Sequence, residues 1–174
     1  MEFFSGSSQH IRITNCFRLL FTQFVPDRIV ELGTGTGHFT SWLAETLPSA
    51  TIYTFDSGAS LRWDESLVVP HNVCRITDSI WNRQSEITSL IAEPDVRTLL
   101  LCDNGDKIRE FQAFAPHVRE GNIVMVHDYW PSLTGFVEEV QGRLWDWCEI
   151  VHADIEDTLK TSNFVPFHEH RMRG

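Results

Sequence analysis

Three glycines at alternate positions, Gly33, Gly35 and Gly37, separate a short apolar segment from an amphipathic one. Residues 28–32 have the composition of a buried strand, and apolar residues recur at helical spacing from the last glycine to residue 47. Glycine tolerates positive φ and allows a ligand to approach the backbone closely. The first N–H groups of a helix also point at whatever lies over such a turn. The unit therefore predicts a ligand-binding strand–turn–helix, with a tight connection that binds nothing as the alternative.

The spacing of these glycines excludes two common nucleotide sites. A dinucleotide-binding turn needs the pattern G-x-G-x-x-G, but its third glycine would fall at His38 or at Thr40. A P-loop is excluded because no Gly-Lys-Ser or Gly-Lys-Thr sequence is present. Glu31 precedes the first glycine by two residues. A carboxylate there would repel a pyrophosphate but would suit a ligand with an ammonium or sulfonium group.

The segment from Glu31 to Gly37 resembles the first motif of the class I methyltransferases that use S-adenosylmethionine (SAM), a ligand that carries both of these positive groups. Those enzymes bind the ribose hydroxyls with an acidic residue at the end of the second strand, a position that Asp56 matches. Asp78 and Ser79 follow the predicted third strand, where the family contacts the adenine, although either residue also suits a helix cap. The resemblance implies this set of SAM-binding residues: Glu31, Gly33, Thr34, Gly35, Gly37, Asp56, Ser57, Asp78, Ser79 and Asp103.

Predicted strands and helices alternate along the chain, a pattern typical of βαβ units with a parallel sheet covered on both faces. We expect a Rossmann-like α/β fold in three layers, with a mostly parallel sheet of about seven strands and a C-terminal antiparallel strand. Residues 1–174 would form one domain, with 1–26 as a helical segment that packs on the core. The expected strands cover residues 28–32, 51–55, 72–76, 97–102, 122–126, 148–153 and 163–167, and the expected helices residues 13–24, 37–47, 60–67, 87–91, 108–118 and 133–140.

Two aspartates in the second half each end a predicted strand, Asp103 after 97–102 and Asp128 after 122–126. In open α/β sheets, ligands bind outside the carboxyl ends of the strands, so both carboxylates are expected on the same edge as the glycine turn. Two aspartates there could hold Mg²⁺, which commonly takes one or two carboxylates plus waters. Such a metal would lower the pKa of a substrate hydroxyl and orient it.

The segments 99–107 and 121–128 resemble the metal-assisted small-molecule O-methyltransferases, which include catechol-type enzymes and relatives acting on sugars or antibiotics. In that group one Asp after the fourth strand and one after the fifth bind the metal, so the resemblance implies Asp103 and Asp128 as metal ligands. Two positions depart from the catechol-type pattern: Tyr129 stands where Asn is usual, and Lys107 comes one residue later than the catalytic lysine.

The pair His127-Asp128 matches relatives that carry a His-Asp pair after the fifth strand. Histidine ordinarily titrates near neutral pH, so His127 is a candidate general base, with a purely structural histidine as the alternative. Lys107 is the second candidate base. The predicted catalytic residues are therefore Asp103, Lys107, His127 and Asp128.

The composition favours a small-molecule partner over nucleic acid or membrane. The net charge of −10 and the scattered basic residues argue against a large nucleic-acid footprint, which needs clustered positive charge. The first residues lack the basic start of a secretory signal, and no apolar run has membrane-spanning length. The four cysteines lack metal spacing and are interpreted as reduced thiols, so we expect a cytoplasmic protein. The sequence His168-Glu169-His170 is interpreted as a polar tail rather than a metal site.

These observations together predict a SAM-dependent methyltransferase that acts on an oxygen of a small hydroxylated molecule, with or without Mg²⁺. One alternative is a non-catalytic SAM-binding module that works with a partner. A nucleotide-binding oxidoreductase is disfavoured by the glycine spacing. Because the predicted SAM core uses nearly the whole chain, we expect an open site, a small acceptor, or completion of the site by a second copy in a homo-oligomer.

Overall fold

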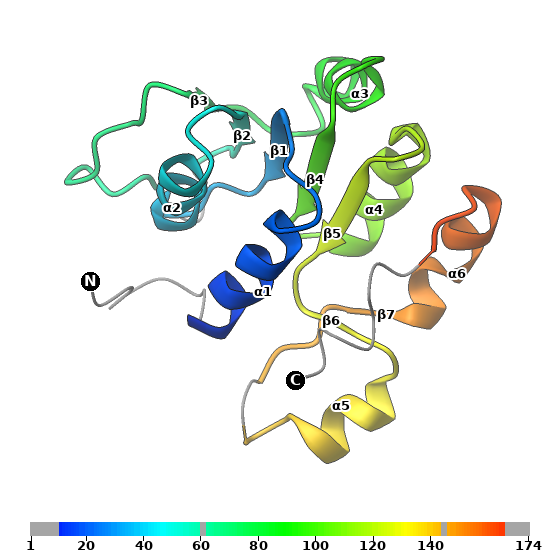
Figure 1. The fold of residues 1–174 in the computed structure, drawn as a ribbon. Coiled ribbons are helices and arrows are strands. Elements are labelled where there is room, and N and C mark those ends of the chain that lie inside the picture. Colours follow the sequence, from blue (N-terminus) through cyan, green and yellow to red (C-terminus); the bar gives the residue numbers. More distant parts are fainter. Residues whose placement is uncertain (1–10, 60–61, 144–145, 166–174) are drawn as a thin grey trace.

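The computed structural model describes residues 11–59, 62–143 and 146–165, with helices and strands alternating along most of the chain (Figure 1). The elements are α1 (Ile11–Phe21), β1 (Arg28–Leu32), α2 (His38–Thr46), β2 (Thr51–Phe55), β3 (Val73–Ile76), α3 (Gln84–Ala92), β4 (Thr98–Cys102), α4 (Lys107–Phe114), the 3-10 turn η1 (Ala115–His117), β5 (Ile123–Val126), β6 (Tyr129–Trp130), α5 (Leu133–Glu139), β7 (Ile150–Val151) and α6 (His152–Thr161). None of the helices in these ranges combines the length and apolar composition needed to cross a bilayer.

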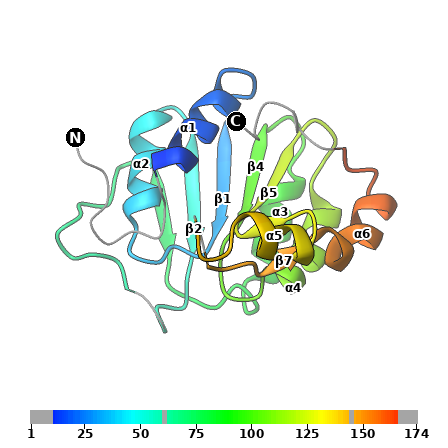
Figure 2. The ribbon, with the colours of Figure 1, turned by 90° about the horizontal axis from the view of Figure 1, so that it is seen from below.

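A five-stranded sheet with the order β3-β2-β1-β4-β5 forms the centre of the molecule (Figure 2). All of its strand pairs are parallel, so all five carboxyl ends lie at one edge. The order runs outward from β1 to β3 and then reverses, which places the switch point between β1 and β4. In folds of this kind, ligands bind beside the carboxyl ends at such a switch point.

Helices cover both faces of this sheet, as the sequence predicts (Figure 1). Leu99 and Leu101 of β4 pack with side chains of α1 and α2 on one face. Leu100 and Cys102 point the opposite way and pack with α3 and α4. The whole of β4 is buried, which explains why its sequence is a continuous apolar run rather than an alternating one.

The expected sheet of about seven strands with an antiparallel C-terminal strand is not what the structure shows. Beyond the five parallel strands, the described residues form only the short pair β6 and β7, which is separate from the main sheet and also parallel. The strand expected at 148–153 is reduced to Ile150–Val151. Of the strand expected at 163–167, residues 163–165 are irregular and 166–167 lie outside the described ranges.

The helix α6, which the sequence did not predict, follows β7 directly. The Asp154 side chain accepts a hydrogen bond from the Val151 N–H at 2.8 Å and so caps the helix start. Ile155 and Leu159, four residues apart, face a small core around Phe111 beyond the β5 edge of the sheet. This helical spacing outweighs the β-branched composition of the preceding residues.

The helix expected at 60–67 is also absent where it can be checked. Residues 60–61 lie outside the described ranges, and residues 62–67 form irregular backbone and a turn. Asp64 organises that turn by accepting hydrogen bonds from the backbone N–H and the hydroxyl of Ser66. A side chain that bonds its own neighbouring backbone in this way competes with helix formation.

Candidate functional site

Most of the predicted site residues come from five loops that start at the carboxyl edge of the main sheet, whereas Glu31 lies within β1 and Lys107 begins α4. The glycine turn follows β1, Asp56 follows β2, Asp78 follows β3, Asp103 follows β4, and His127 with Asp128 follows β5. The turn and Asp103 flank the switch point between β1 and β4. The parallel topology therefore gathers residues that are far apart in the sequence at one edge.

The glycine turn is held by close packing within the chain. A Cβ atom on Gly33 would lie 2.3 Å from the backbone oxygen of Asp103, and one on Gly37 would lie 2.3 Å from the indole ring of Trp63. Both residues also have positive φ, +101° and +81°. Side chains at these two positions would therefore clash with the residues that close the turn.

Asp56 connects this turn to the loop after β2. One carboxylate oxygen accepts a hydrogen bond from the Gly35 N–H at 2.9 Å, and the other accepts one from the Gly58 N–H at 2.7 Å. Each carboxylate oxygen can accept a second hydrogen bond. Asp56 thus holds the turn in place while keeping capacity for the two hydroxyls of a ribose, and the neighbouring Ser57 is exposed.

Glu31 lies beneath the turn with only 2% of its surface exposed. Its carboxylate accepts hydrogen bonds from the hydroxyls of Thr40 at 2.6 Å and Thr54 at 2.5 Å, and Thr54 in turn bonds the Thr34 hydroxyl. Burial raises the pKa of Glu31 to about 7, although the two threonine hydrogen bonds oppose the rise. The carboxylate therefore supports the turn from below, and direct contact with a ligand ammonium group stays a prediction.

Asp78 and Ser79 organise the turn that leads to α3. The Asp78 carboxylate accepts hydrogen bonds from the Ser79 N–H, the Asn82 amide and the Arg83 guanidinium. Hydrogen bonds from Asn82 and Arg83 lower the pKa of Asp78. Neither residue caps α3, whose N-cap is Arg83 without a side-chain cap, so the helix-cap alternative is wrong; an adenine contact stays a prediction.

Five charged residues meet at the ends of β4 and β5, and we call them the strand-end charge cluster: Asp103, Lys107, His127, Asp128 and Glu149. The Lys107 ammonium lies 3.6 Å from a carboxylate oxygen of Asp103 and 3.6 Å from one of Asp128, and it forms an ion pair with Glu149. The His127 Nδ1 atom lies 3.2 Å from Asp103 and 3.1 Å from Asp128. Two positive groups therefore lie against three carboxylates.

Both positive groups of the cluster carry their proton at neutral pH. Burial opposes the charged form of His127, but its hydrogen bonds to Asp103 and Asp128 outweigh burial and raise its pKa to about 9. Burial also opposes the charge on Lys107, and the hydrogen bond to Glu149 with the nearby carboxylates raises its pKa nevertheless. Either residue would have to lose this proton before it could act as a base, so their catalytic role stays a prediction.

The strand-end charge cluster does not fit the Mg²⁺ site that the sequence suggested. Magnesium needs oxygen ligands at about 2.0–2.1 Å in octahedral geometry. The carboxylates of Asp103 and Asp128 instead face the Lys107 ammonium and the His127 ring. Within residues 11–59, 62–143 and 146–165, no group of three or more His, Cys, Asp or Glu side chains is arranged to hold a metal ion.

Two carboxylates of this region, the exposed Glu149 and the buried Glu110, were not predicted from the sequence. Glu149 reaches the cluster because its N–H donates to the Asp128 backbone oxygen at 3.1 Å, a contact that no local motif announces. Glu110 is fully buried and accepts hydrogen bonds from the N–H groups of Asn104 and Asp106, and burial raises its pKa to about 6. The sequence signal that could have identified Glu110 is its position in the first helical turn after the capping residue Asp106.

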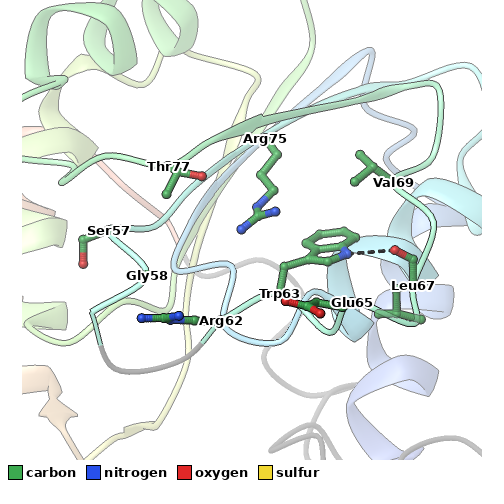
Figure 3. A pocket seen from close by; sticks show the side chains of 9 residues that line it. All are labelled: Ser57, Gly58, Arg62, Trp63, Glu65, Leu67, Val69, Arg75 and Thr77. Atoms are coloured by element: carbon green, nitrogen blue, oxygen red, sulfur yellow. Dashed lines mark hydrogen bonds between the residues drawn. The ribbon is translucent and has the colours of Figure 1, made fainter.

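A pocket of about 530 Å³ lies beside the loop after β2, which contains Asp56. The loop before β3 and the C-terminal end of β3 form its other walls (Figure 3). The Trp63 indole N–H donates to the Leu67 backbone oxygen at 3.0 Å, and the Arg75 guanidinium lies 5.4 Å from the centre of the Trp63 ring. The lining residues are Ser57, Gly58, Arg62, Trp63, Glu65, Leu67, Val69, Arg75 and Thr77. The ring that packs on Gly37 therefore also forms one wall of this pocket.

The fold is similar to that of solved structures described as O-methyltransferases. The O-methyltransferase TomG from Streptomyces achromogenes, involved in tomaymycin synthesis and solved in complex with SAM, superposes with a TM-score of 0.53 and 17% identity over 88% of this chain and 69% of its own. A protein of Nostoc punctiforme PCC 73102, described provisionally as an O-methyltransferase, superposes with a TM-score of 0.59 and 14% sequence identity. The match covers 88% of this chain and 50% of the Nostoc protein. This chain thus spans only half the length of the Nostoc protein.

No protein-family model matches the sequence, and neither does any curated protein. At the identities found for the two solved structures, the likeness establishes the fold alone. Function therefore has to be argued from the residues of the site.

Proposed function

We propose that this protein binds SAM and transfers the methyl group to an oxygen of a small hydroxylated molecule. The observation that carries the proposal is the glycine turn tied to Asp56, through the Gly35 N–H, at the carboxyl edge of the sheet. The shared fold supports it, since one of the structures with this fold holds SAM.

The residues take distinct roles under this proposal. The turn from Gly33 to Gly37 accommodates the methionine part of SAM, and the Asp56 carboxylate accepts hydrogen bonds from the ribose hydroxyls. Asp103 and Asp128 face the acceptor. The acceptor oxygen forms a bond to the methyl carbon as the carbon–sulfur bond breaks, the sulfonium becomes a neutral thioether, and the hydroxyl proton passes to a carboxylate or to deprotonated His127. The protein's main contributions are alignment and proton removal.

The partner we propose is a small-molecule acceptor rather than nucleic acid or a membrane, in keeping with the net charge of −10. We also propose a cytoplasmic location, in keeping with four cysteines interpreted as reduced thiols. A homo-oligomer in which a second copy completes the acceptor side is also part of this proposal, as an expectation from the sequence.

Calorimetric titration tests the SAM site. SAM and S-adenosylhomocysteine should bind the wild-type protein, and NAD should not. Asp56→Ala removes the acceptor of both the Gly35 and Gly58 N–H groups and should weaken SAM binding at least about tenfold, or 1.4 kcal/mol. Asp157→Ala, an exposed acidic residue on α6, is the matched control and should bind like wild type. Binding of NAD with no binding of SAM would contradict the proposal.

A non-catalytic SAM-binding module is the second candidate, and one observation favours it. Both residues considered as bases, Lys107 and His127, are protonated and held against carboxylates at neutral pH. The variants Asp103→Ala and Asp128→Ala separate the two functions in an assay with a panel of hydroxylated acceptors. Loss of methyl transfer with unchanged SAM affinity identifies an enzyme. Bound SAM with no transfer to any acceptor identifies the module.

A further inference from the structure

The ammonium of Lys107 lies where the two strand-end aspartates converge. Lys107 is the first residue of α4, and its side chain turns inward so that only 4% of it is exposed. The nitrogen lies within 3.6 Å of Asp103 and Asp128, pairs with Glu149, and donates to the Asn104 backbone oxygen at 3.4 Å. All four neighbours are oxygen atoms, the ligand type that hard cations prefer.

The position of the lysine in the sequence explains how it reaches this point. Lys107 lies four residues after Asp103, and Asp106 caps α4 by accepting from the Arg109 N–H. The helix start therefore holds the lysine stem beneath the end of β4. Since β4 and β5 pair in parallel register, Asp103 and Asp128 come to the same nitrogen.

We propose that the Lys107 ammonium is the resident cation of the strand-end charge cluster, in the place that a divalent metal would need, and that SAM binding and methyl transfer proceed without such a metal. The cation assignment stands on the geometry alone, whereas its consequence for methyl transfer rests on the proposed function. Lys107 is then a positioning residue: it holds Asp103 and Asp128 at a fixed separation rather than touching the reacting atoms.

Charge balance gives the proposal a measurable consequence. Lys107 lies against three carboxylates, so its removal takes one positive charge away from all three. Carboxylates that are partly shielded from water and lose a positive neighbour favour the binding of another cation. Lys107→Met keeps most of the apolar stem and deletes the charge, so this variant should acquire a divalent-cation site that the wild-type protein lacks.

The test titrates chelator-treated protein with MgCl₂ and MnCl₂ by calorimetry and follows the melting temperature Tm. Wild type should show no saturable binding at millimolar cation and an unchanged Tm. Lys107→Met should bind one cation per chain, and its Tm should rise with cation concentration, because a ligand of the folded state stabilises that state. Lys160→Met removes the only other lysine, an exposed residue paired with Glu156 on α6, and should behave as wild type.

Two results overturn the proposal: saturable binding by wild type that Asp103→Asn removes, or a folded Lys107→Met variant that gains no cation site. If Lys107→Met does not fold, the wild-type titration decides alone. SAM titrations with and without chelator form a separate arm, in which equal affinities are expected. If SAM binds neither with nor without chelator, the proposed function is wrong, and the metal titration alone tests the cation assignment.

Discussion

The backbone oxygen of Asp103 lies 2.3 Å from the point that a Cβ atom on Gly33 would occupy. Gly33 follows β1 and Asp103 follows β4, so the two strands that flank the switch point are in backbone contact at the site itself. The Gly33 N–H donates to Phe55 of β2 and the Asp103 N–H donates to Leu32 of β1, both at 2.8 Å. The position of the turn and the position of Asp103 are therefore coupled.

This contact predicts a severe effect of Gly33→Ala. The added methyl group would meet the Asp103 oxygen, and alanine disfavours the φ of +101°. We expect a loss of at least about 2 kcal/mol in the free energy of unfolding and no measurable SAM binding. Urea denaturation and calorimetry provide these values. Gly105→Ala is the matched control, since a Cβ there meets no atom within 4 Å, and it should change stability by less than about 0.5 kcal/mol.

Gly37 and Trp63 provide a second prediction, in the form of a double-mutant cycle. A Cβ on Gly37 would overlap the indole ring, so Gly37→Ala should cost more stability in the wild-type protein than in the Trp63→Ala background. Residues in direct contact couple by about 0.5–3 kcal/mol, and we expect a value in the upper half of that range. Additive effects of the two substitutions would show that the ring does not close over the turn in solution.

How much of this site the sequence predicts depends on how local each contact is. The strand–turn–helix around Gly33–Gly37 and the place of Asp56 were both predictable, because each depends on a strand end and the residues next to it. The strand-end charge cluster was predictable only for residues that follow β4 and β5. Glu149 joins it through a backbone bond to Asp128, and such a contact has no signature in the intervening sequence.

The C-terminal part shows the limit of composition as a guide. The segment from 148 to 153 contains β-branched residues, which favoured a strand, yet the structure begins α6 at His152. The deciding features were the Asp154 cap and the four-residue spacing of Ile155 and Leu159. Both features are present in the sequence, but Ile155 and Leu159 favour a helix only because Phe111 provides an apolar surface on which they pack.

The buried position of Glu31 predicts a specific dependence of stability on pH. Its pKa is raised from 4.5 to about 7, so the folded state favours the protonated form. The stabilising contribution is complete below about pH 4.5 and is lost as the pH rises through about 7, by roughly 3 kcal/mol at about 1.4 kcal/mol per pKa unit. Glu31→Gln cannot ionise and should remove this part of the dependence.

Urea unfolding of wild type and Glu31→Gln at about pH 5 and about pH 8 checks this effect. The variant should gain stability relative to wild type at the higher pH. Glu138→Gln, which alters an exposed glutamate on α5, should show no such difference. A wild-type-to-variant difference that is the same at both pH values would mean that Glu31 ionises normally despite its burial.

His127 yields the prediction that bears most directly on catalysis. Its pKa is raised to about 9 because hydrogen bonds to Asp103 and Asp128 outweigh burial, so its contribution to stability is complete below about pH 6.5 and is lost as the pH rises through about 9. An NMR titration of the imidazole, assigned with His127→Gln, should show this high midpoint. Asp103→Asn removes one of the two carboxylate partners and should move the midpoint down toward 6.5.

If deprotonated His127 is the base, methyl transfer by wild type should increase with pH up to the same midpoint. In Asp103→Asn, the midpoint of the rate profile should fall together with the midpoint of the imidazole. A rate that stays constant across this range would assign proton removal to another group, and a wild-type imidazole midpoint at or below 6.5 would show that the two carboxylates do not hold the ring as described.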